Sequence, residues 1–382
     1  MRKELKSKKF KFIPVNKPLI TKEDIIYINK SISKGWVSSE GPEVKRFENN
    51  FSNFIGHKYS VAVSSGTAAL EIAIKSLNLK KGDEVIIPNF TIISNAIAVL
   101  KENLNIKLID CNIKDWNMDI SQIKKKITKK TKAIIATHIY NFPLRIDILK
   151  KICNKNKIIL VEDAAETVGQ KLNNKLCGSF GDISIFSFYA NKQITTGEGG
   201  MITTNNKKLY EKSKNLRNLC FGKKDRFNHE DIGWNYRMTN LQASLGVSQL
   251  KRIKSIVNKR HEVGKEYFKR LRNNKNIYIP ETERVYAKNI YWVIGLVITN
   301  KKLRIDAKKL MKKLMNYGIQ TRPFFWPMNK QKIFKNKSQI NTRGSYKNSE
   351  YISKYGLYLP SSLNIKFSQI KFICEKVNSV LK

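Results

Sequence analysis

Residues 183–201 read Ile-Ser-Ile-Phe-Ser-Phe-Tyr-Ala-Asn-Lys-Gln-Ile-Thr-Thr-Gly-Glu-Gly-Gly-Met. This stretch is the most informative part of the sequence. An apolar strand is predicted over 183–188, and Lys192 follows it just before a turn rich in threonine and glycine. A lysine shielded from water at a strand end has a lowered pKa and can act as a nucleophile, which suits a Schiff base with an aldehyde cofactor. The alternative is a strand that ends in a solvated lysine, and only further parts of a cofactor site argue against it.

Short β-rich segments alternate with helical segments between residues 60 and 205. Strands are predicted at 60–63, 84–88, 106–109, 132–137, 157–162 and 183–188. Helices are predicted between them, among others at 67–77, 91–100 and 145–153. This alternation predicts an α/β fold with a mainly parallel sheet that is covered on both faces.

The chain of 382 residues is long for one hydrophobic core and predicts a large and a small domain. A long helical region at 239–272 precedes apolar runs at 277–279 and 290–298. Helices are then expected at 306–317 and from residue 367 onward. We expect residues 1–250 to form the large cofactor-binding domain, with the N-terminal segment, and 251–382 to form a smaller α+β domain.

Cysteine usage and hydropathy favour a cytoplasmic protein. The five cysteines are far apart, odd in number and form no Cys-x-x-Cys pair, which argues against a disulfide framework or a metal site. The lysine-rich start has no apolar core of a signal peptide, and no apolar run is long enough to span a bilayer.

The formal net charge of +43 raises the question of nucleic-acid binding. The lysines are scattered as doublets and triplets and do not form a stripe, and no nucleic-acid-binding motif accompanies them. High lysine, asparagine and isoleucine together are typical of drift in an AT-rich genome. We therefore expect weak polyanion binding without a specific nucleic-acid partner.

The segment Ser64-Ser65-Gly66-Thr67-Ala68-Ala69-Leu70 lies between a predicted strand and a predicted helix. Gly66 permits a tight turn, and the amides of Thr67 and Ala68 would form the helix N-terminus, where a cofactor phosphate can bind. A plain helix N-cap is the alternative interpretation. The hydroxyl of Ser187, at the end of the strand before Lys192, is a candidate further phosphate donor.

Two more strand ends carry candidate cofactor contacts. Asp163 closes the strand Val161-Glu162-Asp163, where ligands of α/β sheets gather, and its carboxylate would pair with a protonated ring nitrogen. Ala165 is small enough for an aromatic ring to lie over it, and Phe90 would cover the other side. Taken singly, an acidic helix cap and a core phenylalanine are the alternatives. Taken together with Lys192, these residues predict a pyridoxal-phosphate enzyme.

The chain resembles the DegT/StrS-type family of pyridoxal-phosphate sugar aminotransferases, most closely its GDP-perosamine synthase branch, nearly from end to end. The resemblance lies in the segments 35–42, 65–70, 162–166, 186–189, 191–200, 233–240 and 321–325. It implies fold type I, with a mainly parallel seven-stranded sheet and a smaller C-terminal α+β domain. It also implies an obligate homodimer with active sites shared between subunits.

The family pattern, carried over to this sequence, names the site residues. Lys192 and Asp163 are the expected catalytic residues. The expected cofactor contacts are Gly66, Thr67, Ala68, Phe90, Asp163, Ala165, Glu166, Ser187, Lys192 and Asn235. Asn235 is expected to reach the phosphate in the partner subunit. The expected substrate contacts are Trp36, Ser38, Tyr189, Arg322 and Phe324.

The resemblance implies amino transfer from L-glutamate to a nucleotide-linked 4-keto-6-deoxy sugar, with pyridoxal 5′-phosphate as cofactor and pyridoxamine 5′-phosphate as intermediate. The best match is GDP-4-keto-6-deoxymannose, giving GDP-perosamine for a surface polysaccharide such as an O-antigen. The alternatives are a UDP- or dTDP-linked keto sugar, a sugar dehydratase, and a non-catalytic polyanion-binding or regulatory protein. One departure is that Asn141 and Phe142 stand where relatives have Gly and then His or Gln.

Overall fold

The computed structural model describes residues 12–222 and 224–382 and is built on a sheet of seven strands in the order β1-β9-β8-β5-β4-β2-β3. In chain order they are β1 (Tyr59–Val63), β2 (Glu84–Pro88), β3 (Asn105–Ile109), β4 (Thr131–Thr137), β5 (Ile159–Asp163), β8 (Ile183–Ser187) and β9 (Gly200–Thr204). Neighbouring strands are parallel except where β9 pairs with β1 and β8. The predicted α/β fold with a mainly parallel seven-stranded sheet is confirmed.

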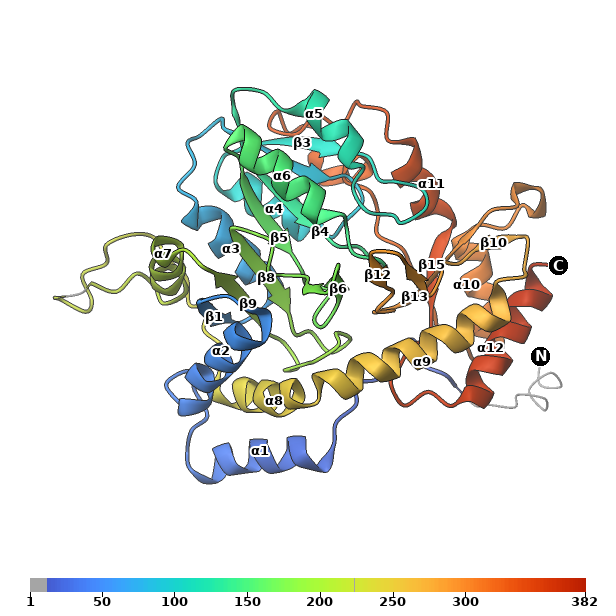
Figure 1. Ribbon diagram of the computed structural model, residues 1–382, viewed down its shortest axis with the longest axis horizontal. Helices are drawn as coiled ribbons and strands as arrows, with labels where there is room; N and C mark the ends of the chain where they lie inside the picture. The colour runs from blue at the N-terminus through green and yellow to red at the C-terminus, as the bar shows by residue number, and fades with distance from the viewer. Residues whose placement is uncertain (1–11, 223) are drawn as a thin grey trace.

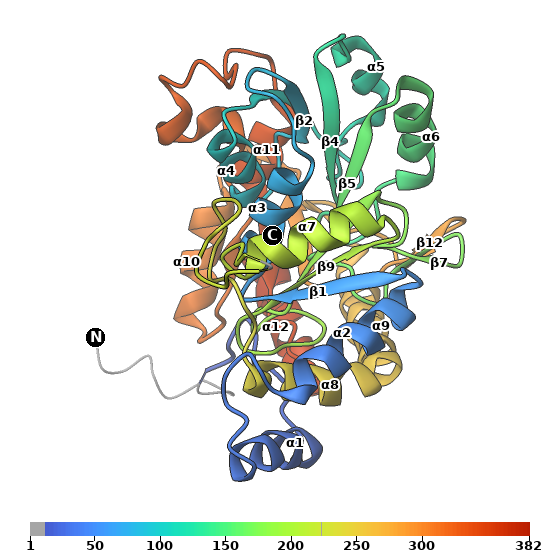
Figure 2. The same cartoon turned by 90° about the vertical axis from the view of Figure 1, so that its left-hand side faces the viewer.

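Both faces of this sheet are buried. Successive side chains of a strand point to opposite faces, so on β4 Ala133 and Ile135 enter one core while Ile134 and Ala136 enter another. The first core is closed by α3 (Gly66–Ser76), α4 (Ser94–Lys101) and α7 (Lys207–Arg217). The opposite face is covered by α2 (Pro42–Ile55), α6 (Ile146–Asn156) and α8 (Asn240–Lys251). Figure 2 shows α7 on one side of β1 and β9, and α2 with α8 on the other.

Helix α1 (Lys22–Ser33) lies against α8, beneath the rest of the molecule in Figure 1. The contact is polar at its centre. Asp24 is fully buried and accepts hydrogen bonds from Ser248 Oγ at 2.7 Å and Arg252 Nη2 at 2.6 Å. Arg252 stands between α8 and the next helix, α9 (Ile253–Leu271).

The C-terminal part has its own sheet and core. The strands β10 (Ile277–Tyr278), β13 (Ile294–Ile298), β15 (Gly356–Leu359) and β14 (Arg322–Pro323) pair in that order. Around them pack α9, α10 (Ala307–Asn316), α11 (Lys347–Tyr355) and α12 (Phe367–Val380), and Figure 1 shows α9 running from α8 toward α12. Ile13 joins this core and bridges to Ile319, so the N-terminal segment contacts both parts. The boundary between residues 250 and 251 stays a prediction.

The shorter elements include one helix and two hairpins. Helix α5 (Ile123–Lys126) follows β3. The hairpins β6 (Lys171–Leu172) with β7 (Lys175–Leu176) and β11 (Glu283–Arg284) with β12 (Ala287–Lys288) extend from the two parts of the chain toward each other.

The sequence missed some boundaries for physical reasons. The helical region at 239–272 is two helices, because Arg252 leaves the helical conformation between them. The apolar run at 290–298 is a strand only from Ile294, because Tyr291 has a φ of +51° and interrupts the extended backbone. Strand β9 was not predicted, because it directly follows the glycine-rich turn.

Replacing Gly264 by alanine should destabilise the protein, although alanine alone favours a helix by roughly 0.5–1 kcal/mol. A Cβ at this position of α9 would collide with the ring of Tyr291. We expect a net loss of roughly 1–3 kcal/mol in the free energy of unfolding, measured by urea denaturation. The neighbouring exposed Lys265→Ala is the control, and a stabilised Gly264→Ala would contradict the packing argument.

Candidate active site

Lys192 lies in the turn after β8, as the sequence predicted. Its Nζ stands 3.8 Å from the centre of the Trp292 ring, and the indole Nε1 of Trp292 donates to the carbonyl of Asn191 at 3.0 Å. Burial lowers the pKa of Lys192, while the carboxyl groups of Glu166 and Asp163 act in the opposite direction. The amine is therefore easier to deprotonate than an ordinary lysine, which is what a nucleophile requires.

Asp163 is the last residue of β5 and is 1% exposed. Its Oδ1 accepts the amide of Ala165 at 3.2 Å and its Oδ2 accepts the hydroxyl of Thr137 at 3.4 Å. Burial raises the pKa of Asp163, and the nearby charge of Lys192 opposes this. A carboxylate in this position needs a cationic or hydrogen-bonding partner.

Glu166 shares the same buried space. Its Oε2 accepts the amide of Tyr140 at 2.7 Å, and its carbonyl accepts Nε2 of Gln193 at 2.5 Å. Burial raises the pKa of Glu166 to about 8, with Lys192 opposing the shift and Asp163 adding to it. Lys192, Asp163 and Glu166 thus form one electrostatically linked group at the ends of β5 and β8.

The pKa of Glu162, one residue before Asp163, is shifted in the opposite direction. Its carboxylate accepts His138 Nε2 at 3.0 Å and the amides of Phe180 and Gly181, each at 2.8 Å. The amide of Leu144 donates to His138 Nδ1 at 3.0 Å, which leaves the ring proton on Nε2 facing Glu162. Burial acts to raise the pKa of Glu162, but these hydrogen bonds prevail and the pKa is lowered.

Hydroxyl groups gather at the N-terminus of α3. Ser65 caps the helix, its Oγ accepting the amide of Ala68 at 3.1 Å. Thr67 Oγ1 lies 2.9 Å from Ser94 Oγ. A Cβ on Gly66 would lie 2.9 Å from Cβ of Ser187, so glycine brings the helix start against the end of β8. The first amides of a helix lack partners within it, and with these hydroxyls they suit a phosphate group.

Phe90 and Phe324 belong to a buried aromatic cluster. Phe90 has no exposed surface, and its ring centre lies 6.0 Å from those of Tyr140 and Phe324. Phe324 is 4% exposed and lies 4.8 Å from Trp116. The position of Phe324 favours a core role over the sugar contact predicted from the sequence. The ring-covering role of Phe90 stays a prediction.

Tyr358 connects two predicted substrate residues with the site. It pairs with Arg322 across β14 and β15, and its ring lies 6.1 Å from that of Tyr140. Burial raises the pKa of Tyr358 to about 12, and the charges of Arg322, Glu166 and Tyr189 also act on it. Arg322 and Tyr189 are exposed around this point, where they can meet a ligand entering the site.

Trp36, Ser38 and Asn235 lie apart from this group. Trp36 and Ser38 are exposed in the loop between α1 and α2, where Asn240 Nδ2 donates to the Trp36 carbonyl at 3.0 Å. Asn235 is exposed in the segment after α7. Among the described residues, no hydrogen bond or ring contact joins these three to Lys192, Asp163 or Glu166. Their predicted roles stay predictions.

The two departures from the family pattern are buried. Phe142 is fully enclosed, with the guanidinium of Arg284 4.4 Å from its ring centre and the Tyr286 ring at 6.4 Å. Asn141 is 2% exposed, and neither polar atom of its side chain has a hydrogen-bond partner among the described residues. Phe142 therefore anchors the loop after β4 to the β11–β12 hairpin.

Comparisons with known proteins agree with this geometry. The DegT/DnrJ/EryC1/StrS aminotransferase family matches residues 18–378. GDP-perosamine synthase of Escherichia coli O157:H7 is 33% identical over 368 residues, which cover 96% of this chain and 98% of that protein.

Two solved structures have the same fold. The aminotransferase PseC of Helicobacter pylori, involved in pseudoaminic acid biosynthesis, has a TM-score of 0.91 at 24% identity and covers 97% of this chain and 99% of its own. E. coli GDP-4-keto-6-deoxy-D-mannose-3-dehydratase with bound hydrated pyridoxal phosphate has a TM-score of 0.86 at 25% identity and covers 97% and 99%.

The chain belongs to the DegT/DnrJ/EryC1/StrS aminotransferase family. It is a fold type I sugar aminotransferase, and the predicted dependence on pyridoxal phosphate is confirmed with the family. The site fits this cofactor. Gly66 and Ser187 form a close cradle at the helix start, Asp163 is a buried carboxylate in need of a cationic partner, and Lys192 is its buried amine neighbour.

Tyr140, Trp292 and Tyr358 lie at the candidate site and were missed by the sequence analysis. They come from the loop after β4, the segment before β13, and β15, and meet only through tertiary packing. Tyr140 has a positive φ of 57°, a conformation uncommon for tyrosine, and no motif marks it. The strand-end position of Tyr140 was the single signal from which it was recognisable.

Within residues 12–222 and 224–382, no group of three or more His, Cys, Asp or Glu side chains is arranged to hold a metal ion. No helix there combines the length and the apolar character that crossing a bilayer requires.

Replacing Glu162 by glutamine should lower the free energy of unfolding near neutral pH by about 3 kcal/mol or more, because it breaks a buried charged network. The folded-state pKa of Glu162 is lowered, so its stabilisation is present above the ordinary glutamate pKa of about 4.3 and is lost as pH falls through the folded-state value. The difference between wild type and Glu162→Gln, followed by urea denaturation, should therefore shrink on acidification.

The matched control for this measurement is Glu262→Gln, because Glu262 forms an exposed pair with Lys259 at 2.8 Å. That variant should change stability by less than about 1 kcal/mol. Equal losses in the two variants, or a Glu162→Gln difference that does not depend on pH, would contradict the buried network.

Proposed function

We propose that this aminotransferase moves the amino group of L-glutamate to the keto carbon of a nucleotide-linked 4-keto-6-deoxy sugar. The proposed substrate is GDP-4-keto-6-deoxymannose and the product GDP-perosamine, for a surface polysaccharide such as an O-antigen. Support comes from the full-length similarity to GDP-perosamine synthase. Amino transfer on a nucleotide sugar made inside the cell places the enzyme in the cytoplasm in this proposal.

The observation that carries the proposal is the half-buried Lys192, whose amine lies against the Trp292 ring and near the charges of Asp163 and Glu166. In the sequence pattern of this family, sugar 3-dehydratases have histidine at the position of Lys192. A lysine amine with a lowered pKa can bind the cofactor covalently and be displaced by the amine of the donor. Once free, it can act as a base. This favours amino transfer over the dehydratase alternative.

The residues have distinct tasks in this proposal. Bound pyridoxal phosphate supplies an electron sink conjugated to the amino-bearing carbon. The carboxylate of Asp163 would accept a hydrogen bond from the protonated pyridine nitrogen and so keep the ring cationic. The free amine of Lys192 moves the proton between the α-carbon of the donor and the C4′ carbon. The ring face of Trp292 can hold the Lys192 side chain in its protonated form.

The phosphate group would anchor the cofactor while the donor and the acceptor substrate replace each other in the site. The amides of Gly66 and Thr67 and the hydroxyl of Ser187 would hold the phosphate at the positive end of the α3 dipole. Ala68, whose amide donates to Ser65 Oγ, lies at the same helix start. Tyr189 and Arg322 stand exposed beside Tyr358, where a sugar or a donor carboxylate enters.

The test is an assay of purified enzyme with L-glutamate against a panel of GDP-, UDP- and dTDP-linked 4-keto-6-deoxy sugars. Release of 2-oxoglutarate should be fastest with the GDP-linked sugar. Lys192→Ala should abolish it but still bind pyridoxamine phosphate, because the phosphate contacts remain. The exposed Lys129→Ala is the matched control.

Each other outcome of this assay has a clear meaning. A sugar dehydrated without 2-oxoglutarate would establish the lyase alternative. Preference for a UDP- or dTDP-linked sugar would overturn the proposed nucleotide while leaving the reaction class in place.

We also propose a homodimer in which each active site uses residues of both subunits. The segment 224–235 projects beyond α7 (Figure 1), with Phe227 79% exposed and Ile232 77% exposed. Exposed apolar side chains at the end of such an arm favour contact with a second copy. Asn235 lies at the base of this arm and would then complete the partner's phosphate site.

Mixing inactive Lys192→Ala with impaired Asn235→Ala under subunit exchange should restore roughly a quarter of wild-type activity. Half of the molecules become heterodimers, and each of these holds one site with both residues intact. Activity is measured at limiting cofactor, and mass spectrometry verifies exchange. If no activity returns although heterodimers form, Asn235 does not act across the interface.

A further inference from the structure

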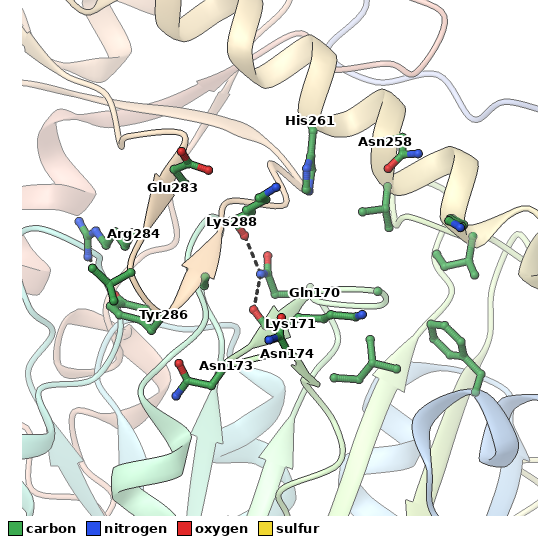
Figure 3. A pocket seen from close by; sticks show the side chains of 18 residues that line it. Gln170, Lys171, Asn173, Asn174, Asn258, His261, Glu283, Arg284, Tyr286 and Lys288 are labelled. Atoms are coloured by element: carbon green, nitrogen blue, oxygen red, sulfur yellow. Dashed lines mark hydrogen bonds between the residues drawn. The ribbon is translucent and has the colours of Figure 1, made fainter.

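A groove lies away from Lys192, between the β6–β7 hairpin, the β11–β12 hairpin and one face of α9 (Figure 3). Its volume is about 950 Å³. None of the residues assigned above to the cofactor or the catalytic group lines it. It is therefore a second concave site, which the aminotransferase reaction does not account for.

Hydrogen bonds hold the walls of the groove in place. Gln170 is 3% exposed, and its Nε2 donates to the carbonyls of Lys171 at 2.9 Å and Lys288 at 2.7 Å, so it joins the two hairpins (Figure 3). The amide of Asn173 donates to the carbonyl of Tyr286 at 2.8 Å. A Cβ on Gly169 would lie 2.6 Å from Cγ2 of Val257, so α9 packs directly on the base of the β6–β7 hairpin. The cavity is preformed.

The rim of the groove is positively charged. Lys171, Lys254 and Lys288 line it, and no ion pair is recorded for any of them within the described residues. Glu283 is the one acidic residue in the lining, and Arg284 is engaged by Glu281 at 3.0 Å. The pKa of His261 is lowered by burial and further by the charges of Lys288 and Lys265. Uncompensated positive charge of this kind binds anions.

The floor of the groove is of a different chemistry. Phe54, Leu176, Ile253 and Val257 provide apolar surface, and Figure 3 shows the amides of Asn173, Asn174 and Asn258 around the opening. Apolar surface accepts a flat ring, amides pair with its edges or with hydroxyls, and lysines bind phosphates. The volume lies in the range of small-molecule sites.

We propose that this groove binds a nucleoside diphosphate group, as a site separate from the catalytic one. Lys171, Lys254 and Lys288 would hold the phosphates and the apolar floor would take the base. A free nucleotide and a nucleotide sugar carry this same group, and either would occupy the groove.

The experiment is calorimetric titration of the cofactor-loaded protein with GDP. Wild type should bind a second equivalent of GDP per chain, beyond that taken at the catalytic site. The double variant Lys254→Glu/Lys288→Glu should lose that equivalent and keep catalytic turnover. The control Lys312→Glu/Lys313→Glu makes the same charge change on α10, where both lysines are exposed, and should keep both equivalents.

A second readout locates the ligand at the groove. The imidazole NMR signal of His261 should titrate at higher pH when GDP is present, because a bound phosphate favours the imidazolium form over the repulsion of Lys265 and Lys288. The chain has only four histidines, which keeps the assignment simple.

Four outcomes would overturn the proposal. They are a single equivalent of GDP in wild type, equal losses in the groove and control variants, an unchanged His261 titration, and displacement of GDP by inorganic phosphate at matched concentration. A short single-stranded oligonucleotide that binds the groove more tightly than GDP would overturn the nucleotide assignment in favour of nucleic acid.

Discussion

One cationic side chain, Lys192, faces two buried carboxyl groups, those of Asp163 and Glu166. The electrostatics of the site follow from this excess of acidic groups over basic ones. Burial raises the pKa of both Asp163 and Glu166, and their mutual repulsion adds to the shift for Glu166. The raised pKa of Glu166 favours its protonated form, which reduces the repulsion between the two carboxyl groups. Strands β5 and β8 are neighbours in the sheet, and this adjacency keeps the three groups together.

Two consecutive carboxylates on β5 show how hydrogen bonds decide the charge state of a buried group. Glu162 and Asp163 are equally inaccessible to water, yet their pKa values shift in opposite directions. Glu162 accepts several amides and the His138 ring, whereas Asp163 accepts the amide of Ala165, the side chain of Asn95 and a distant hydroxyl. The saturated carboxylate is structural, and the undersaturated one is available for a ligand.

The site residues that could be predicted from the sequence are recognisable from their immediate neighbours in the chain. The turn after β8 and the end of β5 are recognisable in the sequence, because an apolar strand leads directly to Lys192 or Asp163. Tyr140, Trp292 and Tyr358 come from three separate elements and acquire their roles only by packing around Lys192 and Glu166. The substrate contact of Phe324 stays a prediction for the same reason, since an aromatic next to a predicted substrate residue cannot be told from a core residue by its sequence position.

Of the two residues that depart from the family pattern, Asn141 and Phe142, Phe142 brings the loop after β4 into contact with the β11–β12 hairpin. Phe142 packs under Arg284 of the β11–β12 hairpin, whose other side forms a wall of the basic groove. Tyr140, two residues earlier, donates its amide to Glu166 beside Lys192. Close-packed side chains do not move independently. The cofactor site and the groove therefore share one wall. Asn141, whose side-chain amide has no hydrogen-bond partner among the described residues, lies in this wall between Tyr140 and Phe142.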